Sequence, residues 1–229
     1  HKLWEIDKTI QECVKNFNFH LMFTTLLNFC SNDLSAFYFD IRKDIIYCDG
    51  KKSIERRSSR TLLDIIFNYL VRWLAPSLSF TTEEAWKARD NKSSIHLEDF
   101  LTIPERYKNF DINNTWITLK QIRKVITGAL EKKRAEKMIG SSLEAHIDIY
   151  LEKTMLEKVK NHKLDEISIT SSFALYEINK TSVGFSLEEV ADVKVSVSKT
   201  TGKKCQRCWK YKKKLIRNEI CDRCNNAIS

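Results

Sequence analysis

Apolar side chains recur at intervals of three and four residues through much of the first half of the chain. The spacing is present in residues 4–16 and 19–39, and it is clearest from Ser53 to Ala75. It places apolar side chains on one face of an α-helix and so predicts packed helices. Pro76 ends the third helix, because proline disfavours the helical conformation in the residue before it. The predicted buried stripe of that helix is Leu62, Ile65, Ile66, Tyr69, Leu70, Trp73 and Leu74.

Two further helices are predicted after this proline. Thr81-x-x-Glu84 has the pattern of a capping box and predicts the start of a short helix. Residues 90–114 are polar and are expected to form an irregular connection. A long helix is predicted from Trp116 to Met138, with Gly140 as its C-cap. Its apolar stripe is Ile117, Leu119, Ile122, Val125, Ile126 and Leu130. The lysines and arginines on the rest of this helix fit an ordinary hydrated face and a binding face equally well.

After Gly140 the apolar period shortens to two residues. Apolar and polar side chains alternate in residues 146–151, 167–169 and 193–197, and a short helix is predicted at about 154–163. Alternation is typical of a strand with one buried face. The segment therefore predicts a small α/β unit whose sheet is polar on one side.

Two Cys-x-x-Cys pairs, separated by 12 residues, lie near the end of the chain. Each two-residue spacer allows a tight turn that points both sulfurs at one ion, so the pattern predicts a tetrahedral zinc site. A disulfide and a redox-active pair are the alternatives. The sequence shows no secretory signal, so a disulfide is not favoured. A redox site needs only one Cys-x-x-Cys pair, which normally follows a buried strand. The predicted zinc ligands are Cys205, Cys208, Cys221 and Cys224.

Three more cysteines, Cys13, Cys30 and Cys48, bring the total to seven. An odd number fits a reducing compartment better than a disulfide framework. All three lie among apolar or aromatic residues, so we interpret them as small core side chains.

The positive charge of the chain is concentrated in its cysteine-rich end. The chain has 39 Lys and Arg against 30 Asp and Glu, a net charge of +9. Residues 1–198 hold 29 basic and 28 acidic residues, whereas residues 199–224 hold 10 and 2, a balance of +8. Such a segment is typical of a protein that binds the phosphate backbone of nucleic acid. A hydrated, solubilising tail is the alternative.

The sequence contains no recognisable catalytic motif. It has no glycine-rich phosphate loop, no nucleophile elbow and no His-Glu-x-x-His pair, and its five histidines are scattered. No apolar run approaches the ~20 residues that span a bilayer, and no secretory signal is present, so we expect a cytoplasmic protein without a membrane partner. The first residue is His1 rather than Met, which suggests a piece of a longer protein.

Three segments of the chain resemble, in the same order, parts of one enzyme family. They are SAFYFDIRKDIIYCD with the following SIERRSSRTLLDIIFNYLVRWLAPSLSFTTEEAW, then EKKRAEKMIGSSLEAHIDIY, and finally KCQRCWKY…ICDRCNN. The first resembles the helical anticodon-binding domain of class I aminoacyl-tRNA synthetases. The others resemble the segment after that bundle and the C-terminal zinc domain of the bacterial-type isoleucine enzymes. The valine, leucine and methionine enzymes share the bundle, so the last two segments, which extend the match to about residue 226, carry most of the specificity.

The resemblance implies a mainly α fold in three domains. These are a helical-bundle anticodon-binding domain (1–139), a small α/β junction domain (140–199) and a zinc-ribbon-like domain with four cysteine ligands (200–229). It also implies one structural Zn²⁺, the tRNA for isoleucine as partner, and a monomer. The ATP-dependent ligation of isoleucine would belong to an upstream catalytic domain, whose HIGH-like and KMSKS-like motifs are absent here, as is the editing insertion. This segment alone is expected to bind and position tRNA without catalysis.

Six side chains are the expected RNA contacts. Unpaired anticodon bases stack on aromatic rings and arginine planes, while lysine and arginine follow the phosphates. Trp209, which follows the ligand Cys208 on a rigid knuckle, is expected to touch the loop; the alternative is that it packs the small zinc unit. Trp73 and Trp86 are expected in the core. The six expected contacts are Trp209, Arg207, Lys210, Arg56, Arg57 and Arg72.

Two other functions remain open from the sequence. The zinc ending also resembles the zinc finger of formamidopyrimidine-type DNA glycosylases, which need an N-terminal catalytic proline, but this chain has no proline before Pro76. A zinc-stabilised domain that meets an acidic protein through its basic tail is the third possibility. Preference for tRNA over duplex DNA and over other acidic polymers separates the three.

Overall fold

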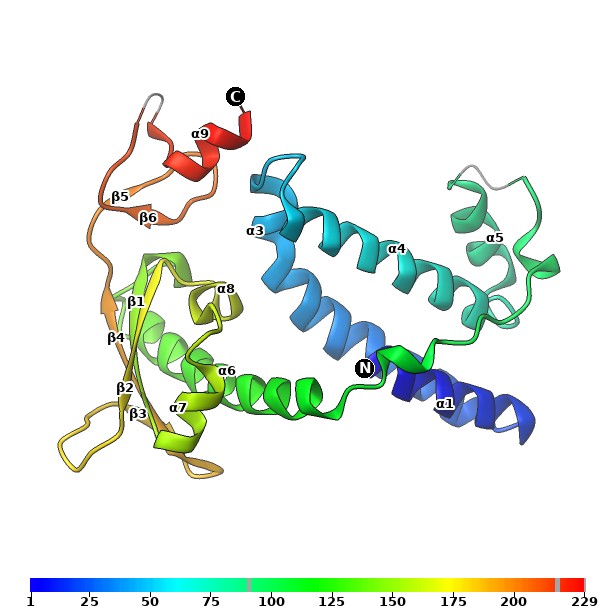
Figure 1. Cartoon of the computed structure of the whole chain (residues 1–229), viewed down its shortest axis with the longest axis horizontal. Helices are drawn as coiled ribbons and strands as arrows, with labels where there is room; N and C mark the ends of the chain where they lie inside the picture. Colours follow the sequence, from blue (N-terminus) through cyan, green and yellow to red (C-terminus); the bar gives the residue numbers. More distant parts are fainter. Residues whose placement is uncertain (90–91, 217–218, 229) are drawn as a thin grey trace. The chain divides into compact units, whose positions relative to one another are not determined.

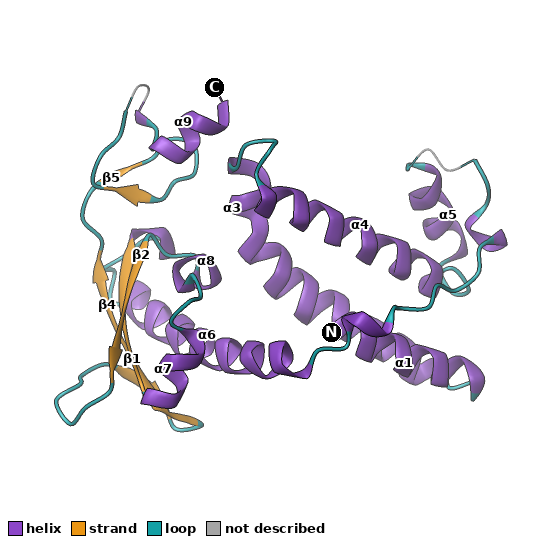
Figure 2. Ribbon diagram, viewed as in Figure 1, coloured by secondary structure: helices purple, strands orange, loops and turns teal. Residues whose placement is uncertain are grey.

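The chain folds into two compact units, each described here by itself. The structure, a computed structural model, describes residues 1–89, 92–216 and 219–228 (Figure 1). As predicted, it is mainly helical, with one small mixed sheet and a C-terminal cysteine cluster (Figure 2). The predicted division into three domains stays a prediction. The first unit comprises His1–Tyr38 and Lys52–Phe110, and the second comprises Phe39–Lys51 and Asp111–Ser229.

Helices surround one apolar core in the first unit. Helix α1 spans Lys2–Lys15, and α2 spans Phe19–Asn28 and continues as a π-helix, η1, over Phe29–Phe39. Phe17 makes the turn between α1 and α2 with a left-handed φ of 55°, and the Asn18 side chain caps α2. The two predicted N-terminal helices are therefore confirmed. Their buried residues include Leu3, Ile6, Ile10, Cys13, Met22, Leu26 and Phe29.

Helix α4, Ile54–Leu74, confirms the clearest of the predicted helices. Ser53 caps its start by accepting a hydrogen bond from a backbone N–H in the first turn, and the helix ends before Pro76. Leu62, expected in the buried stripe, is exposed, because the apolar core begins one turn further along the helix. The other stripe residues pack inward: Ile66, Tyr69 and Trp73 are buried, and Ile65, Leu70 and Leu74 are half-buried.

The predicted capping box at Thr81 is wrong. Helix α5 spans Ser79–Lys87, so Thr81 lies inside it. Glu83 instead caps a neighbouring turn by accepting hydrogen bonds from the Ser94 hydroxyl and the Ile95 N–H, each 2.9 Å long. The connection after α5 is also more ordered than predicted. It contains two 3-10 turns, η2 at Ile95–Leu97 and η3 at Glu105–Tyr107, and its first residues, 90 and 91, lie outside the described part.

The long helix predicted next is α6, Phe110–Ala135, which begins and ends earlier than expected. Lys137 adopts a left-handed φ of 57°, and the Met138 N–H donates to the Lys133 carbonyl over 3.0 Å. This is the Schellman arrangement, in which a left-handed residue closes the last helical turn. Lys137 takes that position although glycine is the usual choice, so the predicted C-cap at Gly140 is wrong.

A four-stranded mixed sheet, in the order β2-β1-β4-β3, forms the centre of the second unit. Strand β1 pairs in parallel with β2 and antiparallel with β4, and β3 pairs antiparallel with β4. The predicted strand at residues 167–169 is wrong, because this segment ends a short helix and Ile169 is left-handed, with a φ of 57°. The strands are β1 (Ala145–Leu151), β2 (Ser172–Glu177), β3 (Phe185–Leu187) and β4 (Val190–Lys199). Short helices flank them: η4 (Ser142–Glu144), α7 (Lys153–Val159) and α8 (Leu164–Ser168).

One face of this sheet is apolar and the other is polar, as predicted. Helix α6 lies against the sheet (Figure 2), so closely that a Cβ atom at Gly128 would meet the Phe185 ring at 2.6 Å. On the other face His146 and Asp148 are only half-buried. Directly opposed apolar pairs are the main side-chain contacts across antiparallel strands. In β1 and β4 these pairs are Ile147 with Val197, Ile149 with Val195, and Leu151 with Val193.

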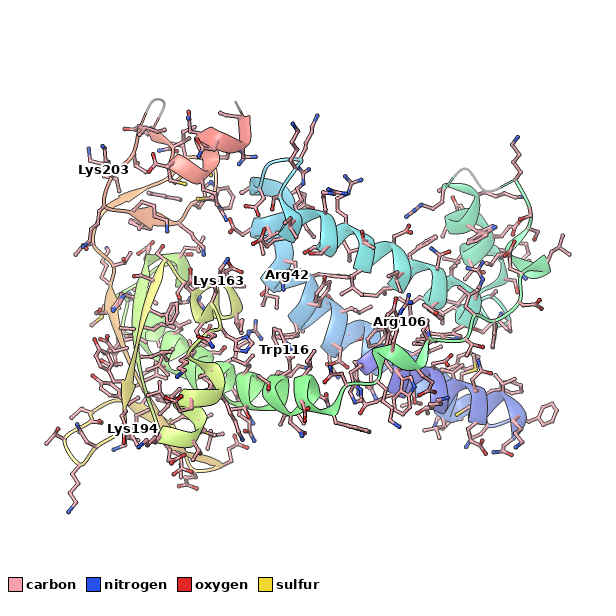
Figure 3. The ribbon with its side chains drawn as sticks, in the orientation of Figure 1. Arg42, Arg106, Trp116, Lys163, Lys194 and Lys203 are labelled. Atoms are coloured by element: carbon pink, nitrogen blue, oxygen red, sulfur yellow. The ribbon has the colours of Figure 1, made fainter. Side chains whose placement is uncertain are left out.

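The cysteine-rich end forms a small unit of its own within the second half of the molecule, which we call the zinc unit (residues 203–228) after the metal predicted from the sequence. It consists of a hairpin, β5 (Lys203–Lys204) with β6 (Tyr211–Lys212), followed by helix α9 (Asp222–Ile228). Lys203 lies on the outer side of the hairpin (Figure 3). Among the described residues, no helix has the length and apolar character needed to cross a membrane.

Candidate metal centre and nucleic-acid interface

The four predicted ligands converge in the zinc unit. The sulfurs of Cys205, Cys208, Cys221 and Cys224 all lie within 4.8 Å of one another, and all four residues are buried. The Sγ atoms of Cys208 and Cys221 are 3.8 Å apart. Zn–S bonds of about 2.3 Å at the tetrahedral angle place two sulfurs about 3.8 Å apart, so the donors fit one tetrahedral metal ion.

Tight turns bring each pair of sulfurs together. In the first knuckle the Trp209 N–H donates to the Cys205 carbonyl over 2.9 Å, and Trp209 adopts a left-handed φ of 63°. In the second, the Cys221 N–H donates to the Cys205 sulfur over 3.3 Å, which joins the two knuckles. Apart from cysteines, the only buried apolar residue among the described residues of this unit is Ile220, with two half-buried apolar neighbours. A metal ion would therefore replace a conventional core.

The thiols of the cluster differ in their pKa. Burial raises the pKa of the Cys205 thiol, but backbone N–H groups that donate to its sulfur outweigh this effect and lower the pKa to about 6. Burial also raises the pKa of Cys208 and of Cys224, and there it is not outweighed. A metal ion deprotonates the thiols that coordinate it, so binding would convert the whole set to thiolates.

Helix α3, Asp40–Cys48, contacts the zinc unit through two arginines. Arg223 donates to both carboxylate oxygens of Asp44 over 2.6 Å, and this bond offsets burial and lowers the pKa of Asp44. Arg207 donates to the Tyr47 carbonyl over 3.1 Å and also to the Cys48 carbonyl. Both arginines therefore position the metal knuckles. Sequence reasoning did not find this contact, since nothing in a sequence pattern pairs residues that lie so far apart in the chain.

Of the expected RNA contacts in the zinc unit, Trp209 is the most exposed. Its side chain is 59% exposed, so the alternative that it packs the small core does not hold. The Lys204 ammonium lies 5.5 Å from the ring centroid. In the first unit Arg57 is exposed and Arg56 is half-buried, both in the first turn of α4. Trp209 and Arg57 are thus accessible to a ligand.

Besides Arg207, two more of the six expected contacts have structural partners. Arg72 is buried, donates to Glu98 over 2.8 Å and lies 4.7 Å from the Trp86 ring centroid. Lys210 is buried as well and donates to Asp165 over 3.0 Å. Both cations already have protein partners, so we do not retain them as RNA contacts. Their interior positions arise from tertiary packing, which the basic character of the residues does not reveal.

The remaining expectations concern the core. Trp73 and Trp86 are buried in the first unit, as predicted. Cys13 is buried there too, whereas Cys30 is only half-buried. Cys48 is buried against the metal-binding cysteines, with its sulfur 3.8 Å from the Arg207 carbonyl. The prediction of a core role is therefore confirmed for Cys13 and Cys48.

Comparison with known proteins gives a consistent picture. The chain is 42% identical over 214 residues to the isoleucine–tRNA ligase of Pelagibacter ubique, a match that covers 93% of this chain and 22% of that protein. The isoleucine–tRNA ligases of Bartonella quintana and Agrobacterium fabrum are 43% and 42% identical, and each match covers 92% of this chain and 22% of the relative. The chain thus spans about a fifth of the length of these curated relatives. Residues 1–149 match the family described as the anticodon-binding domain of tRNA ligase. The chain therefore belongs to the family of anticodon-binding domains of tRNA ligases.

Proposed function

We propose that the chain is the tRNA-recognition part of an isoleucine–tRNA ligase. It binds the anticodon stem and loop of the tRNA for isoleucine, and it holds the tRNA so that the acceptor end reaches a catalytic domain elsewhere in the protein. The ATP-dependent ligation belongs to that domain. Positioning matters because a misplaced reacting group loses large factors in rate. The similarity to isoleucine–tRNA ligases supports the specificity for isoleucine.

Zinc is the metal that we propose for the cysteine cluster. Four thiolates with tetrahedral spacing and no open position are typical of a structural zinc site. The residues that hold it are Cys205, Cys208, Cys221 and Cys224. Zinc bound there supplies no reaction chemistry; it fixes the knuckle that carries Trp209. Free thiols of this kind persist in a reducing compartment, which supports a cytoplasmic location.

The conformation of Trp209 is the observation that carries the RNA-binding proposal. A bulky residue with positive φ is strained by about 1–2 kcal/mol, and such strain is concentrated at functional sites. Here the strained backbone holds a large aromatic ring in solvent on a rigid turn. An exposed, fixed ring is the surface on which an unpaired base stacks, and Lys204 beside it suits a phosphate. Arg57 and Arg56 are proposed as further contacts from the first unit.

The test is the affinity of the zinc-loaded chain for the tRNA before and after Trp209→Ala. Loss of one stacked base costs about 1–3 kcal/mol, so the dissociation constant is expected to rise about fivefold to a hundredfold. Zinc content should be unchanged, because the side chain lies outside the buried cluster. Phe19→Ala, which removes an exposed ring from another part of the chain, is the matched control. Equal affinity for the Trp209→Ala variant and the unaltered chain would contradict the proposal.

A further inference from the structure

We propose that a polar groove between the mixed sheet and the zinc hairpin binds the phosphodiester backbone of the RNA, apart from the anticodon contacts. The inference rests on the proposed function, because it names a second place at which the same RNA is held. The groove encloses about 480 Å³. Strands β1, β2, β4 and β6 line it, together with Ser171 just before β2 and with the residues that directly follow β4 and β6.

The floor of the groove is a row of polar side chains across three strands. His146 of β1 stands directly opposite Ser172 of β2 on one side and Ser198 of β4 on the other. The imidazole is hydrogen-bonded to the Ser172 hydroxyl over 2.8 Å and to Asp148 over 3.2 Å. All three row residues lie on the face that α6 leaves uncovered. The hydroxyls and the imidazole can donate and accept, which suits both phosphate oxygens and a ribose 2′-hydroxyl.

The wall of the groove is the zinc hairpin, which is fixed at this end of the sheet. The Ser171 hydroxyl accepts a hydrogen bond from the Tyr211 N–H over 2.7 Å and donates to the Leu143 carbonyl over 2.5 Å. Gly202 has a φ of 120°, and a Cβ atom there would lie 2.5 Å from the Lys212 carbonyl oxygen. Only glycine permits this close approach, so the hairpin keeps Lys212 beside the sheet.

The charge of the groove is positive. Lys199, Lys212 and Lys213 line it, and among the described residues Lys212 and Lys213 form no ion pair. Lys199 has a carboxylate neighbour, Glu144, at 3.9 Å, and its side chain remains 63% exposed. The other nearby carboxylate, Asp148, is hydrogen-bonded to His146. Three lysines over a floor of hydroxyls form an anion site, and three separate positive charges around a volume of about 480 Å³ suit a chain of phosphates better than one small ion.

The test removes the three lysine charges while the side-chain length is kept. The triple variant Lys199→Gln, Lys212→Gln and Lys213→Gln is compared with Lys153→Gln, Lys158→Gln and Lys180→Gln. The control lysines are exposed and follow the C-terminal ends of β1 and β2, whereas the groove lies at the N-terminal ends of these strands. Affinity of each full-length, zinc-loaded chain for the tRNA is measured across a salt series. A second groove variant, Lys199→Gln with Lys213→Gln, leaves the strands of the hairpin unaltered and keeps the test valid if the triple variant loses zinc.

The groove triple variant is expected to bind the tRNA about tenfold to a hundredfold more weakly. The slope of log affinity against log salt should also fall in magnitude by about 2–3, because each lost phosphate contact removes about 0.7–0.9. The loss should be equal for the tRNA and for a copy with a changed anticodon, since phosphate contacts carry no base information. Unchanged affinity and slope would overturn the inference. If Trp209→Ala still weakened binding in that case, the proposed function would stand without the groove. If the unaltered chain failed to bind tRNA, both the proposed function and the groove would be overturned.

Discussion

Removal of the metal is expected to unfold the zinc unit and leave the helical unit intact. The only buried apolar side chain there besides cysteines, among the described residues, is Ile220, with Leu215 and Ile216 half-buried. At about 1.5–3 kcal/mol per fully buried side chain, these three contribute at most about 3–6 kcal/mol. A structural zinc ion contributes about 10–16 kcal/mol to the folding of a small domain. The metal thus contributes more than the apolar side chains do, and the unit cannot remain folded without it.

The loss of structure on metal removal should extend into helix α3. Arg207 and Arg223 hold the end of this helix through the Tyr47 and Cys48 carbonyls and through Asp44. When the knuckles unfold, these bonds are lost and the last turn of α3 becomes free to fray. Helices α1 and α4 have their own buried core and should not respond.

Hydrogen exchange measured by mass spectrometry, with and without a chelator, tests this expectation. Peptides from 203–216 and 219–228 should lose protection on metal removal, those from α3 should lose part of it, and those from α4 should keep it. Cys221→Ser should reproduce the effect, and Cys30→Ser, a thiol outside the cluster, should not. Unchanged protection in residues 203–216 after confirmed metal release would refute the reasoning.

Two of the buried or partly buried ion pairs give further predictions. Arg223→Met removes the bidentate pair with Asp44 and should cost about 1–2 kcal/mol, discounted for partial exposure, as measured by zinc-unit melting with Lys214→Met as control. The pKa of Asp44 lies below its usual 3.8 in the folded chain, so the pair stabilises above that pH. The stability difference from the Arg223→Met variant should shrink as the pH falls through the lowered pKa; a constant difference would contradict the assignment. Arg72→Met should destabilise the first unit by about 1–3 kcal/mol in urea unfolding, because Glu98 loses its positively charged partner. At temperatures where the variant is folded, tRNA affinity should be unchanged, and a large loss there would restore Arg72 as an RNA contact.

The sequence predicts local structure well where one physical signal dominates. The stripe of α4 and the two Cys-x-x-Cys pairs need only their own spacing. The strand prediction failed at residues 167–169. Ile-Ser-Ile alternates as a strand does, but these residues end helix α8, with Ile169 left-handed. Lys137 closes α6 in a conformation usually left to glycine, so the C-cap was placed too far along the chain.

Long-range partners could not be predicted at all. Arg72, Arg207 and Lys210 were grouped as RNA contacts because they are basic. The structure pairs Arg72 with Glu98 and Lys210 with Asp165. It shows that Arg207 donates hydrogen bonds to backbone carbonyls at the end of α3. Such pairs depend on the way in which distant segments meet. The sequence left open whether Trp209 packs the small core, and only the structure shows that its ring faces solvent.

Recognition of the anticodon is the most specific part of the proposed function, and the affinities for two tRNAs measure it. The zinc-loaded chain is titrated with the tRNA for isoleucine and with the same tRNA carrying a changed anticodon, at one stated salt concentration, because affinity depends steeply on salt. The account predicts clearly weaker binding of the changed tRNA. Equal affinity for both would contradict it and would reduce the chain to a basic clamp on the phosphate backbone.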